Sequence, residues 1–206
     1  YIIVITLIIA APIGIGSAIY LNEYAKPGKL VRTIEFTTEI LSGIPSIIFG
    51  LAGMVFFGMT LKLGYSVLTG SFTLTLMVLP LITRNTQEAL KTVPDSYRSG
   101  ALGIGATKWY MIRTILLPSA APGILTGVLL SIGRIVGESA ALLFTAGSGF
   151  QLPKNLFGKL FESSGTLTIQ LYLSMQKAKY DQAFGIAVVL LIIVLGINLL
   201  TRFLTN

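Results

Sequence analysis

Five stretches of about 20 residues, each without a charged side chain, most constrain what this sequence can fold into. They cover residues 1–20, 40–61, 63–83, 114–133 and 182–201. A helix of about 20 residues spans the hydrocarbon core of a bilayer, and in lipid its backbone groups are all paired within the helix. None of the stretches shows the polar–apolar alternation of barrel strands. The sequence therefore predicts an all-α integral membrane protein, with five transmembrane helices in a single domain over residues 1–206.

The composition agrees with a membrane protein and argues against several kinds of chemistry. Hydrophobic residues make up 53% of the chain and charged residues 11%, and the mean hydropathy is +0.83. The chain has no cysteine and no histidine, which removes disulfides, thiolate chemistry and the commonest metal ligands. We expect no enzyme, no metal and no cofactor, because the predicted membrane helices carry a single acid, Glu138, where the fourth stretch continues beyond residue 133.

The chain begins at Tyr1, inside an apolar run and without a basic segment ahead of it. These features differ from those of a signal peptide, and further spans follow. We therefore expect an excerpt of a longer protein, with one more span ahead of residue 1.

The basic residues of the loops indicate which side of the membrane is cytoplasmic. If the spans alternate, nine basic residues lie on one side: three in 21–35, five in 84–113, and Arg202. Five lysines lie on the other side, at Lys62 and within 148–181. Cytoplasmic loops carry the excess of Lys and Arg, so the first side is predicted to be cytoplasmic. The net charge of +7 is spread over these loops, which argues against nucleic-acid binding.

The second predicted span contains signals for a bend and for close packing. Pro45 lies near its start and removes one helical hydrogen bond. The same span contains four glycines, which allow close approach of a neighbouring helix: Gly43, Gly50, Gly53 and Gly58. Two interpretations stay open, namely a kinked helix that serves packing and a bend that lines a transport pathway.

The fourth predicted span carries two small-xxx-small pairs, Gly123/Gly127 and Gly133/Gly137. At about 100° per residue, the two pairs face different directions. A helix with close-packing faces on two sides is predicted to be central in its bundle.

Arg134 and Glu138 are the charged residues of this region. At i and i+4 of one helix they would be neighbours on one face, about 6 Å apart along the axis. Counted from Pro122, Arg134 lies about 18 Å along the helix, near the middle of the bilayer. A charge there costs at least about 2.5 kcal/mol. One interpretation is an ion pair that fixes helix rotation, and the other is a polar site on a transport route where Arg134 meets or gates an anion.

The segment 84–118, between the third and fourth predicted spans, is too long for a tight turn. Pro94 disfavours helix at the residue before it, and either Asp95 or Ser96 suits the N-cap of a helix that follows. Gly105 suits a left-handed cap at the end of that helix. We predict a coupling helix within 95–107 and a second short amphipathic piece over 108–118 at the membrane surface. The alternative is a surface connector without a partner.

This segment resembles the cytoplasmic loop of the MetI-like permeases of ABC importers. Their signature is Glu-Ala-Ala, three residues of any type, Gly, nine residues of any type, and then Ile-x-Leu-Pro. In this sequence Gly105, Ile115, Leu117 and Pro118 have that spacing. The opening triplet departs from it, with Ser99-Gly100-Ala101 in place of Glu-Ala-Ala, so any family salt bridge at that glutamate loses its basis. The resemblance covers essentially all of 1–206. It implies a MetI-like core with a coupling helix that contacts an ATPase through Asp95, Ser99, Gly100, Ala101 and Gly105.

Further stretches resemble the A-type permeases of phosphate importers. They include TRNTQEALKTVPDSYR, SGIPSIIFGL, RTILLPSAAPGILTGVLL and GRIVGESAALLFTAG. The Arg-x-x-x-Glu pair formed by Arg134 and Glu138 is a mark of phosphate permeases. The resemblance implies a multi-pass inner-membrane permease subunit of an ATP-driven phosphate importer. Its implied partners are a second, C-type permease, two copies of an ABC ATPase, an extracytoplasmic phosphate-binding protein, and phosphate itself.

Other functional classes fit the residues less well. The chain has no GxxxxGK[ST] loop, so an ATP-driven transporter would need a separate motor. A membrane enzyme would need nucleophiles or ligands gathered at one depth. A channel or secondary transporter could use Arg134 and Glu138 but would not need the docking signature. Among ABC importers, the alternative is a permease for another oxyanion, molybdate or sulfate.

The loop 148–180 is too long for a simple hairpin and mixes apolar with polar residues. We expect short helices against the outer membrane face, with Lys154, Lys159 or Lys177 near the binding protein. A solvated loop is the alternative.

Overall fold

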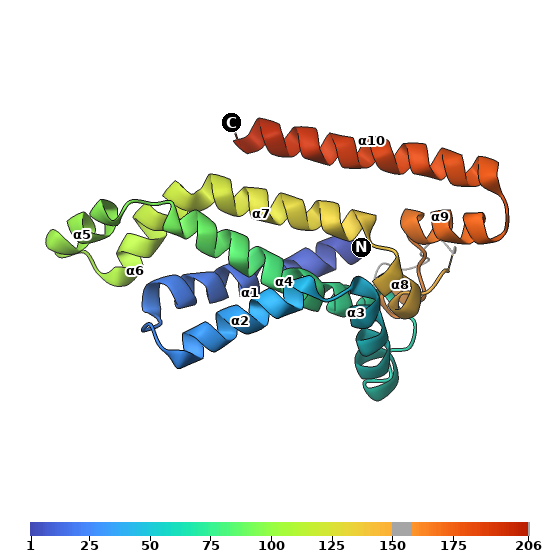
Figure 1. Ribbon diagram of the computed structural model, residues 1–206, viewed down its shortest axis with the longest axis horizontal. Coiled ribbons are helices and arrows are strands. Elements are labelled where there is room, and N and C mark those ends of the chain that lie inside the picture. The colour runs from blue at the N-terminus through green and yellow to red at the C-terminus, as the bar shows by residue number, and fades with distance from the viewer. Residues whose placement is uncertain (150–157, 206) are drawn as a thin grey trace.

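The computed structural model describes residues 1–149 and 158–205, and it shows an elongated bundle of helices (Figure 1). The elements are α1 (Ile2–Ile19), η1 (Tyr20–Tyr24), α2 (Lys29–Gly43), α3 (Ser46–Gly53), η2 (Met54–Thr60), α4 (Val67–Lys91), α5 (Asp95–Gly103), α6 (Lys108–Met111), η3 (Ile112–Leu116), α7 (Leu117–Gly137), α8 (Ala140–Thr145), η4 (Gly158–Phe161), α9 (Leu167–Gln176) and α10 (Tyr180–Thr205). The all-α prediction is confirmed.

Four helices in the described part of the chain are long and apolar enough to cross a membrane. They are Ile2–Tyr24, Val67–Lys91, Lys108–Gly137 and Tyr180–Phe203. A fifth crossing is possible only if α2 and the α3–η2 helix count as one span, because they are bent by 100° at a short break. The predicted spans at 114–133 and 182–201 fall within two of the four, and those at 1–20 and 63–83 overlap the other two.

The second predicted span is not the single kinked helix that Pro45 suggested. The chain leaves the helix at Ile44 and Pro45, whose backbones are extended, and α3 begins anew at Ser46. Proline lacks the N–H that would bond to the preceding turn, and it disfavours helical geometry at the residue before it. The stretch 40–61 is therefore divided between two helices in different directions, and it counts as a fifth span only as a bent pair with α2.

The helix at the centre of the described chain is α4. It packs against α1, α2, α3, α7 and α8, and 67% of its most apolar window is buried, compared with 28% for the window in Lys108–Gly137. The prediction that the fourth span is central is wrong for this chain. That prediction assumed that both small-xxx-small pairs pack against other helices, but the second pair, Gly133 and Gly137, faces open space.

The buried face of α4 is rich in hydroxyl side chains. Ser66 caps its start by accepting a hydrogen bond from Thr69 N at 3.2 Å. Ser71, Thr73 and Thr75 each donate to the backbone carbonyl four residues earlier at 2.8 Å. Small hydroxyl residues paired in this way can be buried without an unsatisfied group, and they let neighbouring helices approach closely.

Glycines set two close crossings of the bundle. A Cβ on Gly127 of α7 would lie 2.6 Å from Asn85 Cβ on α4, and a Cβ on Gly123 would lie 2.6 Å from Ala89 Cβ. On α3, a Cβ on Gly50 would lie 2.7 Å from Ala141 Cα in α8. These positions therefore need glycine for packing.

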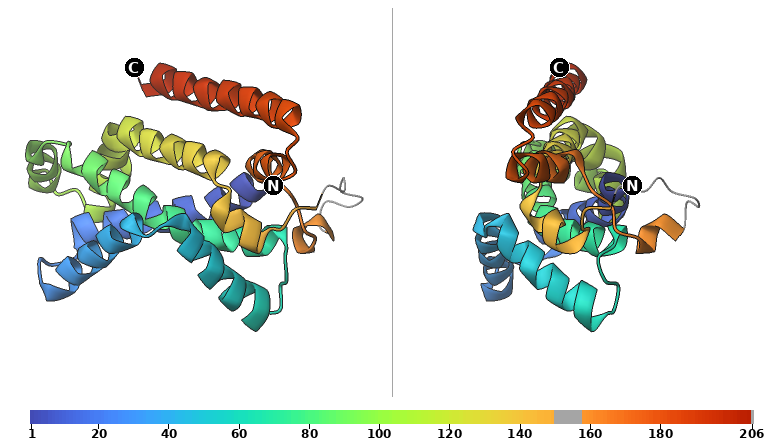
Figure 2. Two further views of the ribbon diagram at one scale, coloured as in Figure 1. Left: turned by 45° about the vertical axis from the view of Figure 1, so that its right-hand side comes forward. Right: turned by 90° about the vertical axis from the view of Figure 1, so that its right-hand side faces the viewer.

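The two ends of the bundle differ in structure. The short helices α5 and α6 lie at one end of the long axis, and α8 and α9 lie toward the other (Figures 1 and 2). The last helix, α10, runs along α7 and α9, and only 6% of its most apolar window is buried. A nearly uncovered helix of this hydropathy is suited to lipid or to another subunit.

Candidate functional site

A short helix, α5, lies where the coupling helix was predicted, and it begins at Asp95 after the extended residue Pro94. The N-cap is Pro94 and Asp95 is the first helical residue, so the prediction that Asp95 or Ser96 is the N-cap is wrong. Its carboxylate instead accepts a hydrogen bond from Arg98 Nη1 at 3.1 Å. An acid in the first turn still interacts favourably with the positive end of the helix dipole.

The end of α5 confirms the predicted role of Gly105. This residue has φ +83°, in the left-handed region. Gly105 N donates to Leu102 O and Ala106 N donates to Ala101 O, both at 3.0 Å. These two bonds are the 5→2 and 6→1 pair of a Schellman motif, in which glycine at the left-handed position avoids a clash with Cβ.

The signature triplet of α5 divides between core and surface. Ala101 is 4% exposed and packs in a hydrophobic cluster with Leu90, Met111 and Ile112. Ser99 and Gly100 lie on the exposed side. Large apolar side chains also stand exposed around α5: Tyr97, Leu102 and Ile104, the last of them 86% exposed. These exposed apolar side chains make α5 a candidate interaction surface.

The stretch after α5 is the start of a membrane span. Thr107 caps it by accepting from Tyr110 N, and α6, η3 and α7 then continue as one helix over Lys108–Gly137. The prediction of a separate amphipathic piece over 108–118 is therefore wrong. The exposed rings of Trp109 and Tyr110 lie in its first turn, where an interfacial belt would lie.

An ion pair between Arg98 of α5 and Glu23 of η1 was not predicted from the sequence. Arg98 Nη2 lies 2.9 Å from Glu23 Oε1, and the two side chains are 19% and 4% exposed. Hydrogen bonding to Glu23 raises the pKa of the Arg98 guanidinium, with burial acting in the opposite direction. The partners are 75 residues apart in the chain, and the sequence contains no local signal for such a contact.

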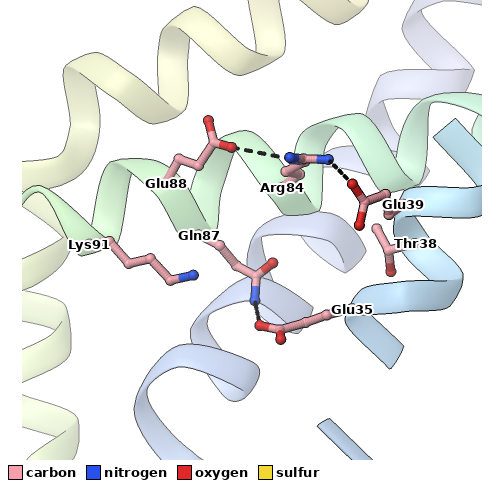
Figure 3. A pocket seen from close by; sticks show the side chains of 7 residues that line it. All are labelled: Glu35, Thr38, Glu39, Arg84, Gln87, Glu88 and Lys91. Carbon is pink, nitrogen blue, oxygen red and sulfur yellow. Dashed lines mark hydrogen bonds and ion pairs between the residues drawn. The ribbon is translucent and has the colours of Figure 1, made fainter. Parts of the chain in front are cut away.

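A second group of polar residues lies between α2 and α4 and is shown in Figure 3. Arg84 pairs with Glu88 at 3.2 Å and with Glu39 at 3.7 Å, and Gln87 Nε2 lies 3.5 Å from Glu35. The group surrounds a pocket of about 210 Å³. The ion pairs are more than half exposed, so each contributes little to stability.

At the other end of the bundle, two breaks in helices lie side by side. A cavity of about 180 Å³ is lined by Ile47, just after the Pro45 break, and by Ser139 and Ala140, just after the end of α7. Non-helical backbone at membrane depth is tolerated only where protein or a water-filled cavity surrounds it. The two breaks are therefore a candidate for the wall of a transport pathway.

Glu138 lies outside the helix that carries Arg134. α7 ends at Gly137, and Glu138 has an extended backbone with φ −79° and ψ 125°. Its carboxylate accepts a hydrogen bond from Ala141 N at 3.1 Å, and its carbonyl accepts from Thr168 Oγ1 at 2.8 Å. The prediction that Arg134 and Glu138 share one helical face is wrong, because Glu138 instead holds the start of α8.

Arg134 remains on α7, in its last turn, and is half-buried. Among the described residues, no hydrogen bond or ion pair engages its side chain. The adjacent Ile135 and Val136 line a cavity of about 200 Å³ together with Leu190 and Ile193, which lie near the middle of α10. The same cavity is lined by Ile2 and Ile3 at the start of α1, so the depth of Arg134 in the membrane stays a prediction.

The outer loop is only partly described. Short helices are present in it, η4 and α9, as the sequence predicted. Lys177 is exposed at the end of α9. Lys154 lies outside the described residues, and Lys159 falls in η4.

Known proteins similar to this chain agree on one family. A family model for a binding-protein-dependent transport system inner membrane component matches residues 10–206. The probable ABC transporter permease protein YqgI of Bacillus subtilis (strain 168) is 35% identical over 99% of this chain and 74% of that protein. The phosphate transport system permease protein PstA of Mycobacterium leprae (strain TN) is 36% identical over 95% of this chain. The chain covers 64% of that relative.

Solved structures show the same fold at lower identity. An inward-facing MetNI methionine ABC transporter matches all of this chain and 90% of its own, with a TM-score of 0.72 and 22% identity. A bacterial ABC transporter involved in the import of the acidic polysaccharide alginate matches all of this chain and 77% of its own, with a TM-score of 0.68 and 19% identity. These matches confirm the MetI-like fold. The family match, the membrane helices and the Gly105 segment together show the family of this chain. It belongs to the binding-protein-dependent inner membrane components, which are the MetI-like permeases of ABC importers.

Proposed function

We propose that this inner-membrane permease is a subunit of an ATP-driven phosphate importer. The observation that carries the proposal is a group of relatives named phosphate transport system permease protein PstA, which are 34% to 40% identical to this chain. The relatives YqgI and YqgH have names without a substrate. The anion is therefore the part of the proposal that most needs an experiment.

Arg134 is proposed to contact the anion on its way through the membrane. Its guanidinium offers donors in a fork that matches two phosphate oxygens. A side chain without an ion-pair partner among the described residues is available for such a contact. A charge near the middle of the membrane is energetically unfavourable, so charged residues there usually have a function, and contact with a passing anion would be such a function.

Glu138 is proposed to shape the same pathway without pairing with Arg134. Its carboxylate holds the first turn of α8 through Ala141 N, and α8 packs against α3 at the Gly50 crossing. Loss of this cap would therefore disturb the wall formed by the two breaks. Glu138 is therefore expected to position α8. Its negative charge would also repel the passing anion, so that binding of the anion stays weak.

The ATPase is proposed to bind at α5. MetI-like permeases work with an ATPase and a substrate-binding protein, and α5 presents the exposed apolar surface described above. The proposed coupling residues are Asp95, Ser99, Gly100, Ala101 and Gly105. Ala101 would act by anchoring α5 to the bundle, and the other four by lying at or shaping the exposed surface.

The remaining partners are proposed from the relatives. They are a second, C-type permease, a dimer of the ATPase, and an extracytoplasmic phosphate-binding protein. The poorly covered α10 and the open face of α7 at Gly133 and Gly137 are surfaces on which a second permease could lie. The exposed Lys177 would face the binding protein at the opposite end from α5.

The test is transport by the assembled complex in liposomes, with a binding protein loaded with phosphate, sulfate or molybdate. We expect phosphate alone to stimulate ATP hydrolysis and to be taken up. Stimulation by sulfate or molybdate, but not by phosphate, would establish the alternative substrate.

Arg134→Gln tests the proposed contact in the same assay. We expect uptake to be lost while the complex still assembles, with the exposed cation Arg202→Gln as the matched control. Full uptake by Arg134→Gln would show instead that Arg134 does not contact the anion.

A further inference from the structure

We propose that Arg98 is a positioning residue, which locks the coupling helix α5 to the cytoplasmic ends of α1 and α4 so that the three move as one body. The proposal rests on the assignment of α5 as the contact site of the ATPase. It adds a named joint, through which force on α5 would reach the membrane helices.

The guanidinium of Arg98 contacts three separate elements at once. It binds Glu23 of η1 with Nη2 at 2.9 Å and with Nε at 3.2 Å from Oε1. It also donates to Leu90 O at 3.0 Å and to Val93 O at 2.9 Å, at the end of α4. One planar side chain therefore holds the end of α1, the end of α4 and its own helix in a fixed arrangement.

This joint is the least exposed ion pair between described residues. The Glu23 side chain is 4% exposed, whereas Arg84, Glu39 and Glu88 in the pairs of Figure 3 are all more than half exposed. A charged, two-pronged contact away from water is shorter and stronger than an exposed one. Removing either partner leaves the other without its match in a buried place.

The end of α1 is shaped to receive the coupling segment. Its last turn, η1, is π-helical, and Ala25 N donates to Tyr20 O five residues earlier at 2.9 Å. Single π-helical turns often lie at functional sites, because they re-aim side chains. A second contact joins the same turn to α6, since Lys108 Nζ lies 5.0 Å from the centre of the Tyr24 ring. Both short helices of the segment therefore bind η1.

The main other contacts of α5 are with α6 and η3, which follow it directly in the chain. Ala101 is the only buried residue of this helix, and a single alanine fixes neither its direction nor its rotation. The orientation of α5 depends instead on Arg98, which reaches past Ala101 to a different element. A weakened joint should leave α5 folded and attached, but free to turn against α1.

Two conservative substitutions test this joint. Arg98→Lys keeps the positive charge but offers a point donor that cannot meet Glu23 and both carbonyls together. Glu23→Gln keeps the shape and one acceptor but removes the charge. The matched control is Arg32→Gln, an exposed cation on α2 on the same side of the bundle.

The first measurement is the distance between spin labels on η1 and α5, at Tyr20→Cys and Ser96→Cys, in the assembled complex and in the permease alone. The chain has no native cysteine, so the labels attach only there. We expect a single narrow distance distribution in the parent and in the control, and a broad one in both joint variants.

The second measurement is phosphate transported per ATP hydrolysed in liposomes. We expect the joint variants to retain ATPase binding and hydrolysis but to lower this ratio by about tenfold or more, the loss expected for one charge-assisted hydrogen bond. A narrow distribution and an unchanged ratio in both variants would overturn the proposal. If the parent complex binds no ATPase, the proposed function fails, and the distance in the permease alone still decides whether Arg98 holds α5 to α1.

Discussion

Substitution of Gly105 gives the sharpest test of the coupling segment, because its geometry isolates one physical effect. The residue has φ +83°, yet no atom lies within 4 Å of the position that a Cβ would occupy. A side chain there would therefore meet no neighbour, and its whole cost comes from the left-handed backbone. Gly103, two residues earlier, is helical and equally open, which makes it a matched control.

The magnitude follows from the backbone preference alone. A residue with a Cβ in the left-handed region costs roughly 1–2 kcal/mol relative to glycine, with β-branched residues at the upper end. Since each 1.4 kcal/mol is a factor of ten, the Schellman motif of Gly105→Ala should open about 5- to 30-fold more often. Gly103→Ala should act in the opposite direction, because alanine is preferred over glycine in a helix by up to about 1 kcal/mol.

Hydrogen exchange of the Ala106 amide measures this opening, because that amide donates to Ala101 O in the motif. We expect faster exchange in Gly105→Ala, still faster exchange in Gly105→Val, and no acceleration in Gly103→Ala. Gly105→Val should also separate ATP hydrolysis from transport while the subunit stays in the membrane. Normal exchange at Ala106, or normal phosphate uptake by Gly105→Val, would refute the reasoning.

Three further predictions concern packing and capping, and each has a matched control. Gly50→Ala should lower the free energy of unfolding in detergent by about 1–3 kcal/mol, because the added methyl group would overpack against the α8 backbone. Gly43→Ala should not lower it, because the added methyl group would meet open space. Gly127→Ala should weaken the α4–α7 crossing in the same melt, and Gly133→Ala should leave it unchanged, so equal melting temperatures would contradict the packing. Glu138→Ala should lower stability by about 1 kcal/mol through loss of the α8 cap, and Glu138→Gln, which keeps an acceptor, should lower it less.

The features that the sequence predicted correctly are those set by local physics. An apolar stretch in lipid has to be helical whatever surrounds it, so four of the five predicted spans coincide with long helices. The left-handed cap at Gly105 depends only on the few residues around it. Pro45 was also identified as a site of distortion, but the size of the distortion depends on what α3 packs against, which is α8, about 90 residues later in the chain.

The joint between Glu23 and Arg98 shows the opposite case. Neither residue stands out in the sequence, since one lies in a short loop of mixed charge and the other is one of five cations in 84–113. Their contact depends on the π-helical turn that aims Glu23 and on the α4 carbonyls that fix Arg98. Hydropathy and residue spacing contain neither piece of information.

Arg134 and Glu138 show why spacing alone misleads near the end of a helix. A separation of four residues predicts a shared helical face only if one helix continues through both residues. Here α7 ends between them, because the Glu138 carbonyl binds Thr168 and its carboxylate binds Ala141 N, an arrangement that no i→i+4 pattern signals. The two charges are thereby assigned to separate tasks, one on the membrane helix and one at the start of α8. If so, substitutions at Arg134 should change transport, whereas substitutions at Glu138 should change the packing of α3 and α8 first.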